Sequence, residues 1–332
     1  MEEKIKISLS KTTLNLLKKD CSDFKILKEN GEPNMNAFVN TLIVNFYESF
    51  SASEESLQED LKNAISIVPD FYKSKVFDNV IKILTKKTDG EISTNGSTTF
   101  SFKPTKVSEK AVLHIENVIL QSESLSSFYR RMFNAYAKRT KTEREKIIHK
   151  ENYEILQKAI KQKAQVCAML SSGKVVNGVS IYAIAPAKDE LFNYVLGFDG
   201  KNNSTVRLAK IKPVTLLSKP SNIPEENKVL LDRQIACAPQ YPMFKSDNKL
   251  IKVELTEKGK TLFEKIYLYR PTPISVDGDV YTFNCSAAQA LYYFERFGNN
   301  ALILSPRKLG IEMRNYHHYA LKKYNAFYNE KI

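Results

Sequence analysis

Polar and apolar residues alternate along the first residues of the chain. Residues 4–10, with the sequence KIKISLS, have the period of two that is typical of a half-buried β-strand. A helix that contains Leu14 and Leu17 can follow. Ser10 can cap this helix, because a serine hydroxyl accepts from the backbone N–H groups of the first turn. The GEP sequence at residues 31–33 then breaks the chain, so we expect one strand and one helix before it.

A second helix and a second copy of the same order follow. Asn34 can cap a helix whose apolar face runs to Phe50. Residues 54–87 have two stretches of helical spacing that are separated at Pro69. Residues 98–103 alternate again, and two further helical patterns are separated by a serine-containing break at residues 122–124. The apolar positions of these last two helices are Val107, Ala111, Val112, Ile115 and Val118, and then Phe128, Met132, Phe133 and Tyr136.

The order strand, helix, helix is the outline of a ribbon-helix-helix half. Ile7 corresponds to Phe102 at an offset of 95, and Phe38 to Phe128 at an offset of 90. A single half cannot fold alone, because its strand needs a partner and its helices are too few to enclose a core. Two halves in one chain therefore predict an internal pseudo-dimer. The alternative is that residues 90–140 form an ordinary helical hairpin with a loose strand.

The period changes to that of strands in the second half of the chain. Five short apolar runs between residues 166 and 217 are bounded by turn residues, which predicts a small curled barrel. Residues 252–255 and 280–285 predict further strands, and Ser286 can cap a helix after them. We therefore expect a small α/β domain at the C-terminal end, and an α+β fold for the whole chain.

Composition adds a preference for a polyanionic partner. The 332 residues carry a formal net charge of +13 and the pI is about 9.3, which favours nucleic acid over an anionic membrane. Seventeen Tyr and eighteen Phe supply rings for stacking. There is no run of 18 apolar residues and no apolar signal core after the charged N-terminus, so we expect a cytoplasmic protein without membrane contact.

Common catalytic and cofactor motifs are absent from the sequence. It contains no GxxxxGK[ST], GxGxxG, HExxH, GxSxG or CxxC pattern, and the four cysteines are isolated, so we expect buried thiols and neither a cofactor nor a metal. Arg144 and His149 have the RxxxxH spacing of HEPN-type ribonucleases. The alternative is a solvated helix face, and we expect no enzyme activity.

Two segments of the second half resemble the WYL-domain family. Residues 192–199 read FNYVLGFD and residues 206–211 read VRLAKI, where family members read approximately WYLVGYD and FRLDRI. The matching positions are Tyr194, Gly197, Asp199, Arg207, Leu208 and Ile211, whereas Asn193, Val195 and Ala209 depart from the pattern. The resemblance implies an Sm-like β-barrel that holds a charged or nucleic-acid ligand with basic and aromatic side chains.

A third segment extends the resemblance. Residues 297–309, FGNNALILSPRKL, are similar to the FGxxAxVLxPxxL that ends the C-terminal extension of WYL regulators. Most such regulators begin with a winged helix, whereas this chain begins with ribbon-helix-helix elements. That order resembles the WYL accessory proteins of type VI-D CRISPR systems, which are associated with single-stranded RNA binding and with stimulation of an RNA-guided ribonuclease.

Domain boundaries follow from these patterns. We expect a ribbon-helix-helix half in residues 1–50, a helical insert in 51–95, a second half in 96–148, the WYL β-barrel in 149–219 and a C-terminal extension that dimerises in 220–332. The last expectation rests on Leu291, Tyr292, Tyr293 and Phe294, four large consecutive residues on one helix that cannot all be buried within a small domain. We therefore expect a homodimer.

Arg207 is the first candidate for ligand binding. It alternates with the apolar Val206 and Leu208 on a strand and should point away from them; the alternative is a surface salt bridge. Tyr194 can stack or lie in the core, Tyr182 and Lys210 are weaker candidates, and Phe192 and Phe198 are expected in the core. The basic run of residues 129–150 adds Arg130, Arg131 and Arg139, which bind phosphate or belong to a solvated linker helix.

Two functions are compatible with these patterns. The first is a non-catalytic, single-stranded RNA-binding accessory protein that acts on a CRISPR effector ribonuclease. The second is a DNA-binding transcription regulator whose WYL domain senses a nucleotide-like ligand. The outward side chains of the predicted ribbon, which include Lys4, Lys6 and Lys103, are short and few, so we expect no sequence-specific reading of DNA.

Overall fold

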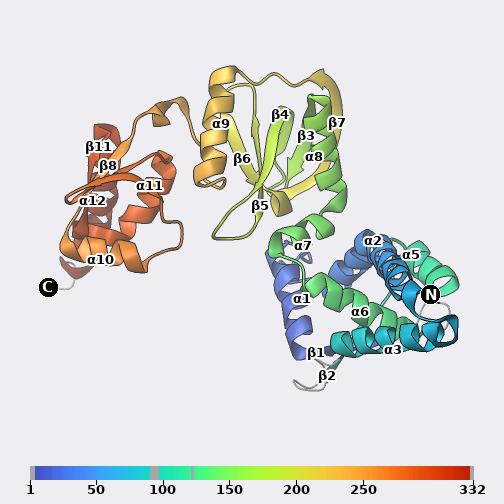
Figure 1. The fold of residues 1–332 in the computed structure, drawn as a ribbon. Coiled ribbons are helices and arrows are strands. Elements are labelled where there is room, and N and C mark those ends of the chain that lie inside the picture. The colour runs from blue at the N-terminus through green and yellow to red at the C-terminus, as the bar shows by residue number, and fades with distance from the viewer. Residues whose placement is uncertain (1–3, 90–96, 121–122, 330–332) are drawn as a thin grey trace. The chain divides into compact units, whose positions relative to one another are not determined.

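Helices and three antiparallel sheets make up the chain in a computed structural model that describes residues 4–89, 97–120 and 123–329 (Figure 1). The structure divides into two compact units, residues 1–150 and residues 151–332. This mixture of helices and antiparallel sheets confirms the α+β class. None of the helices described is both long and apolar enough to cross a membrane.

The first unit is mainly helical. Its elements are β1 (Ile5–Ser10), α1 (Lys11–Asp23), α2 (Met35–Ala64), a 3-10 turn (Ile65–Ile67), α3 (Asp70–Asp89), β2 (Ser97–Phe102), α5 (Glu109–His114), a π-helical turn (Ile115–Ile119), α6 (Leu125–Ala137) and α7 (Lys141–Ile148). The hydroxyl of Ser10 accepts from the backbone N–H of Thr13, and the side chain of Asn34 accepts from that of Ala37. The two caps expected from the sequence are therefore confirmed.

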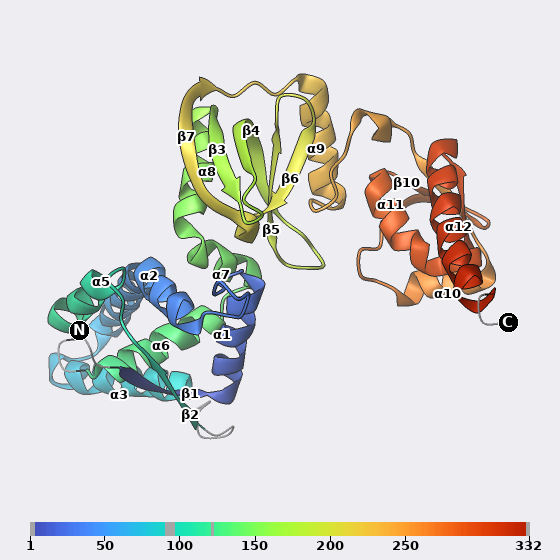
Figure 2. The ribbon, with the colours of Figure 1, turned by 180° about the vertical axis from the view of Figure 1, so that it is seen from behind.

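A two-stranded antiparallel ribbon pairs β1, near the start of this unit, with β2, about 90 residues later in the sequence (Figure 2). Ile7 pairs with Phe100, Ile5 with Phe102 and Lys6 with Ser101. Helices α1 and α2 come directly after β1, and α5 with its π-helical turn and then α6 come directly after β2, which is the order on which the tandem interpretation depends. The identification of these segments as two ribbon-helix-helix halves stays a prediction.

Helix α2 runs without a break across the boundary that we placed between residues 50 and 51. Phe50 and Ser51 are both buried, so the face that covers the core continues past that position. Residues 52–64 contain neither glycine nor proline and are rich in Ala, Leu, Glu, Gln and Lys, which favour the helical state. The chain turns only at the 3-10 segment before Pro69.

Buried aromatic rings fill the first unit. Phe38 and Phe46 of α2 each contact the ring of Tyr136 on α6, with centroid distances of 6.3 and 6.2 Å. Phe50 and Phe128 form another edge-to-face pair at 5.5 Å. These arrangements are favoured by the ring quadrupole and fix how α2 and α6 pack.

The second unit contains a five-stranded sheet and a four-stranded sheet. The first part consists of α8 (Lys150–Gln162), β3 (Ala164–Leu170), β4 (Val175–Pro186), β5 (Asn193–Phe198), β6 (Asn203–Arg207), a 3-10 turn (Leu208–Lys210), β7 (Ile211–Pro220) and α9 (Glu225–Cys237). Its strand order is β6-β5-β4-β3-β7, and all pairs are antiparallel. Among the residues described, the edge strands β6 and β7 do not pair with each other, so the closed barrel stays a prediction.

Helices α8 and α9 cover opposite faces of the five-stranded sheet (Figures 1 and 2). Val195 of β5 belongs to the apolar cluster that contains Leu156 of α8. The next residue, Leu196, packs with Leu231 of α9. Successive side chains of a strand point to opposite faces, so one strand contributes to two separate cores.

The last part of the chain is a four-stranded antiparallel sheet with three helices. Its elements are a 3-10 turn (Lys245–Asn248), β8 (Ile251–Leu255), α10 (Glu257–Lys265), β9 (Pro273–Asp277), β10 (Val280–Phe283), α11 (Ala287–Phe294), a 3-10 turn (Glu295–Asn300), β11 (Ala301–Ser305) and α12 (Arg307–Asn329), with strand order β11-β8-β10-β9. Ser286 caps α11 through the N–H of Gln289, as expected. Phe263, Tyr293, Phe294 and Met313 bring the three helices together on one core with the sheet.

Candidate nucleic-acid interface

A cavity of about 650 Å³ lies beside the end of β6 in the five-stranded part. Its lining comes from three sources: the turn after β3, the strands β5 and β6 with the segments next to them, and the segment after α9. The lining residues are Leu170, Ser171, Ser172, Glu190, Phe192, Tyr194, Thr205, Val206, Arg207, Lys210 and Gln240. Three of the seven sequence-predicted site residues, Tyr194, Arg207 and Lys210, therefore lie around one cavity.

Arg207 is the last residue of β6 and its side chain lines this cavity. The neighbouring Val206 and Leu208 pack into the core beneath α8, so the alternation of the strand directs Arg207 to the other side. Its guanidinium carbon lies 3.1 Å from the centre of the Phe192 ring. A guanidinium on an aromatic face is a favourable cation–π contact, which holds the charge at the cavity wall.

Phe192 lines the cavity and is partly exposed, so our assignment of this ring to the core was wrong. Leu191, just before it, has a φ of 56°, and this left-handed backbone begins the turn into β5. Phe198, at the other end of the strand, is 8% exposed and belongs to the core as expected. The apolar run in the sequence does not show that Phe198 is buried and that Phe192 is partly exposed.

Tyr194 lies directly opposite Arg207 in the β5–β6 ladder. Its hydroxyl donates to the carboxylate of Glu190, which also accepts from the hydroxyl of Tyr269 at 2.7 Å. Burial, followed by the hydrogen bond to Glu190, raises the pKa of Tyr194 above its usual value. The ring therefore stays a neutral donor and forms one wall of the cavity, with its polar end already occupied.

Lys210 and Tyr182 differ in their relation to the cavity. Lys210 is exposed and lines it, and its backbone carbonyl accepts from the N–H of Ser171 at 2.8 Å. Tyr182 is not among the lining residues; its hydroxyl donates to Asp232 at 2.7 Å. This hydrogen bond, with a smaller contribution from burial, raises the pKa of Tyr182 to about 12.

The three arginines predicted from the basic run lie in the first unit and have different partners. Arg130 donates from Nε to the carbonyl of Ser8 on the ribbon at 3.1 Å. Arg131 forms ion pairs with Glu54 and Glu123. The charge of Arg131 is therefore balanced within the protein.

Arg139 is exposed, with its guanidinium carbon 5.2 Å from the centre of the Phe46 ring. It also accepts, through its backbone carbonyl, from Nη1 of Arg144 at 2.6 Å. Of the three predicted arginines it is the most exposed, since Arg130 and Arg131 are partly buried.

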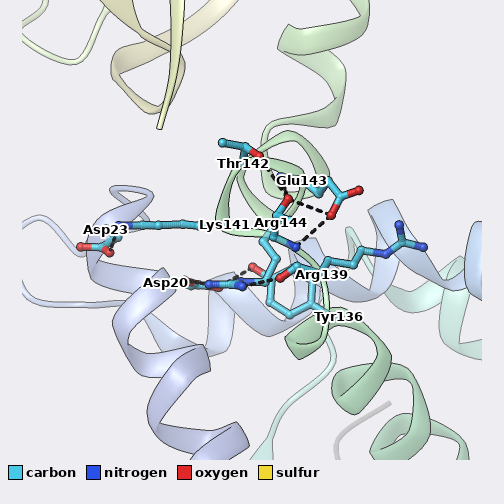
Figure 3. Close-up of polar contacts among 9 residues, drawn as sticks. Asp20, Asp23, Tyr136, Arg139, Lys141, Thr142, Glu143 and Arg144 are labelled. Atoms are coloured by element: carbon cyan, nitrogen blue, oxygen red, sulfur yellow. Dashed lines mark hydrogen bonds and ion pairs between the residues drawn. The ribbon is translucent and has the colours of Figure 1, made fainter. Parts of the chain in front are cut away.

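Arg144, whose contacts are drawn in Figure 3, and His149 are both held by contacts inside the first unit. Nε of Arg144 lies 2.6 Å from Oδ2 of Asp20, and the hydroxyl of Tyr136 donates to the same oxygen at 3.0 Å. Nearby, Lys141 pairs with Asp23 at 2.8 Å. Nε2 of His149 lies 3.0 Å from the carbonyl oxygen of Phe24. Arg144 of α7 and His149, which follows α7, therefore contact α1 and the residue directly after it.

No protein-family model and no curated protein matches the chain. One solved structure, described as the crystal structure of a CRISPR Cas-related protein, is 20% identical with a TM-score of 0.64, and the match covers 98% of this chain and 95% of that one. Proteasome accessory factor B/C (PafBC) of Arthrobacter aurescens is 15% identical with a TM-score of 0.23 over 66% of this chain and 35% of that one. The chain therefore has the fold of the CRISPR Cas-related protein along almost its full length.

Proposed function

We propose that this protein is a non-catalytic single-stranded RNA-binding accessory protein that stimulates an RNA-guided CRISPR ribonuclease. The observation that carries the proposal is the cavity at the end of β6, where two cationic side chains and two aromatic rings surround one space. The cations are Arg207 and Lys210, and the rings are Phe192 and Tyr194.

This combination suits an unpaired nucleic-acid strand. Arginine and lysine neutralise phosphates, and aromatic faces stack on bases that are free of a partner strand. A duplex keeps its bases stacked on one another, so the rings would have nothing to bind. The net charge of +13 would attract any nucleic acid, whereas the cavity would give the preference for a single strand.

The CRISPR context of the proposal comes from the shared fold. The likeness to the CRISPR Cas-related protein spans both units of this chain, which agrees with the resemblance of its sequence to WYL accessory proteins. Stimulation of a ribonuclease requires a partner enzyme, and we propose that RNA held at the cavity is presented to that effector.

Filter binding with single-stranded RNA, single-stranded DNA and duplex DNA of one sequence tests the proposal. We expect the tightest binding for single-stranded RNA, at a salt concentration held constant because the phosphate contribution varies with salt. Cleavage by a co-expressed RNA-guided ribonuclease should also rise when the protein is added. Tight, sequence-dependent binding of duplex DNA would contradict the proposal.

A DNA-binding transcription regulator is the second candidate, and the ribbon favours it. Lys4, Lys6 and Lys103 are exposed, as are Thr99 and Ser101, while Ile7 and Phe102 of the same ribbon are buried. A two-stranded ribbon fits the major groove of duplex DNA. Replacing Lys4 and Lys6 with alanine would weaken duplex binding under this candidate, and would leave binding of single-stranded RNA at the cavity unchanged under the first.

A further inference from the structure

A second groove lies at the other end of strands β3 and β7 from the cavity beside β6. It has a volume of about 450 Å³, and the end of α8, the start of β3 and the end of β7 line it with Gln162, Lys163, Ala164, Leu216, Leu217, Ser218, Lys219 and Pro220. Lys163 and Lys219 are exposed, and neither forms an ion pair with any residue that the structure describes. The lining contains no Asp or Glu, so this groove, which we call the distal groove, is positively charged.

The distal groove and the cavity lie at opposite ends of one pair of neighbouring strands (Figure 1). Ala164 pairs with Pro220 at the distal groove. Leu170, which lines the cavity, pairs with Ile211 at the other end. The seven residues of β3 place these ends about 20 Å apart at the usual rise of a strand. This separation exceeds the Debye length of about 8 Å at physiological ionic strength, so the cations at one end act on a phosphate independently of those at the other.

The backbone holds the two lysines of the distal groove on one local framework. The carbonyl oxygen of Lys163 accepts from the N–H of Ser221 at 2.7 Å, which attaches the residue after α8 to the residue after β7. Lys163 has a φ of 48°, in the left-handed region where glycine is the residue of lowest cost. A long charged side chain at such a position points to a use for its ammonium group. Lys163 and Lys219 are thus carried by segments that are fixed to each other.

The sheet that carries both sites has no acidic residue in its strands. Strands β3, β4, β5, β6 and β7 contain neither Asp nor Glu. Residues 155–188 and residues 200–224, which supply four of these strands, each have five Lys or Arg residues and no Asp or Glu, which gives a charge of +10 for the two ranges together. Met169 of β3 and Thr215 of β7 are exposed between the two ends. A phosphate backbone that follows β3 and β7 therefore meets no carboxylate of these strands.

We propose that the distal groove is a second phosphate subsite for the RNA: one phosphate is held at Arg207, and the strand follows β3 and β7 until a later phosphate lies between Lys163 and Lys219. This inference rests on the proposed function, because it extends the same RNA site. It adds a minimum length to the RNA that the protein holds firmly. An OB-fold barrel covers about 4–16 nucleotides, and a strand of that length spans the two subsites.

The test compares a dinucleotide with a single-stranded RNA of about twelve nucleotides. The dinucleotide has one internucleotide phosphate and occupies one subsite at a time, and the cavity with its aromatic rings is the stronger of the two. The double variant Lys163→Gly, Lys219→Ala removes both ammonium groups, and glycine accepts the left-handed backbone at residue 163. Lys219→Glu alone is a second variant, should the double variant fail to fold. The double variant Lys258→Ala, Lys265→Ala, at exposed positions of α10 that line none of the cavities described, is the matched control.

Affinity is measured by isothermal titration calorimetry at two salt concentrations, with thermal melting to establish that each variant is folded. We expect the variant of Lys163 and Lys219 to weaken binding of the longer RNA by roughly tenfold and to make its salt slope shallower by about 0.7 unit, the value for one phosphate of a single strand. Binding of the dinucleotide should stay unchanged. Lys219→Glu should act in the same direction, Arg207→Ala should weaken both ligands, and the control should weaken neither.

An unchanged affinity for the longer RNA, an equal loss for both ligands, or an equal loss in the control would overturn the distal subsite while the RNA-binding function stands. Failure of the wild-type protein to bind the longer RNA at all would overturn the proposed function instead.

Discussion

Arg207 and Phe192 present a joint surface to the cavity, because the guanidinium lies on the ring. A stacked guanidinium is more weakly hydrated than an ammonium and loses less freedom when it binds phosphate. The pair combines the positive charge that a phosphate requires with an aromatic ring of the kind on which bases stack. The side chains of Arg207 and Phe192 therefore act together as one binding element.

Arg207→Ala should weaken binding of single-stranded RNA by about 1–3 kcal/mol, the usual value of one charged or stacked contact. Since one phosphate contact would be lost, the slope of log affinity against log salt should become shallower by less than about one unit. Filter binding at two salt concentrations measures both effects.

Arg314→Ala, at an exposed position of α12, is the matched control for this experiment. It removes the same charge from the whole molecule without altering the cavity. The two variants should melt at the same temperature as the wild type. Equal loss of affinity in both would mean that net charge alone governs binding and that the cavity is not the site.

Arg144→Met should destabilise the first unit by about 3–5 kcal/mol, because it leaves Asp20 buried without its cation. The double variant Asp20→Asn, Arg144→Met should recover part of this loss, since it removes the uncompensated charge. Urea unfolding of the two variants and of the wild type measures the coupling. A loss below about 0.5 kcal/mol for Arg144→Met would contradict a structural role for this pair.

Side-chain direction could be predicted for Arg207, whereas the partners of charged residues could not. The direction follows from local alternation along a strand. By contrast, Arg131 and Arg144 are balanced by Glu54 and Asp20, which are far from them in sequence. A basic run looks the same in the sequence whether its charges face solvent or distant carboxylates, so the structural role of part of this run became visible only in the fold.

The β1–β2 ribbon has the register that two equivalent strands would adopt. At the offset of 95 found in the sequence, the counterpart of Lys6 is Ser101, and these two residues face each other. Ile5 then faces Phe102, which is the counterpart of Ile7, and Ile7 faces Phe100, which is the counterpart of Ile5, as in an isologous pair. This register favours the tandem interpretation over a loose strand beside a helical hairpin.

Asn40 of α2 fastens the segment that follows this ribbon. Its amide donates to the carbonyl of Lys103 at 3.0 Å and accepts from the N–H of Thr105 at 3.1 Å. It also accepts from the hydroxyl of Ser108, which is fully buried. One side chain therefore satisfies three groups of a segment that has no regular secondary structure before α5.

Asn40→Leu should lower the free energy of unfolding of the first unit by about 2–3 kcal/mol, because buried polar groups would lose their partners. Asn45, whose amide donates to the carbonyl of Ile147 at 2.8 Å, is only partly buried, so Asn45→Leu should cost less. Thermal melting compares the two variants. Equal costs would show that the Asn40 contacts have no special role in attaching β2.

Helix caps and strand periods were predictable at this scale, while element lengths were not. Ser10, Asn34 and Ser286 cap helices as their sequence context indicates. Helix α2 continues past the boundary that we placed after residue 50, because Phe50 and Ser51 are buried and the residues after them favour the helical state. Residues 115–119 form a π-helical turn, and no feature of the sequence had indicated it.

The chain as a whole consists of two units whose basic residues have different surroundings. Several cations of the residues 129–150 run are paired in the first unit, whereas Arg207 and Lys210 of the second unit line a cavity. The α+β class and the change from helices to strands near residue 164 were both predictable, because each depends on hydrophobic period alone. The place of Gln240 at this cavity was not predictable, since it depends on a loop that Gln234 and Thr205 hold in place.

Helix α12 extends the apolar surface of the C-terminal part beyond its own core. Leu309 and Met313 are buried, and Tyr316, Tyr324 and Phe327 follow at the same helical spacing but are 52%, 64% and 55% exposed. On α11, Tyr293 and Phe294 are buried within the domain, so two of the four residues on which we based the homodimer do not face outward. The exposed part of α12 therefore carries more large apolar side chains than the exposed part of α11.

We predict that the protein is a homodimer held through the second half of α12, where the aromatic face of one helix would pack against that of a partner copy. Deleting residues 316–332 should yield a monomer in sedimentation equilibrium at micromolar concentration and leave the near-UV circular dichroism of the core rings unchanged, because the side chains described in this segment are mostly exposed. Tyr324→Lys should weaken the dimer, and Lys322→Ala, at an exposed neighbouring position, should not. A wild-type protein that sediments as a 37.9 kDa monomer would contradict the prediction.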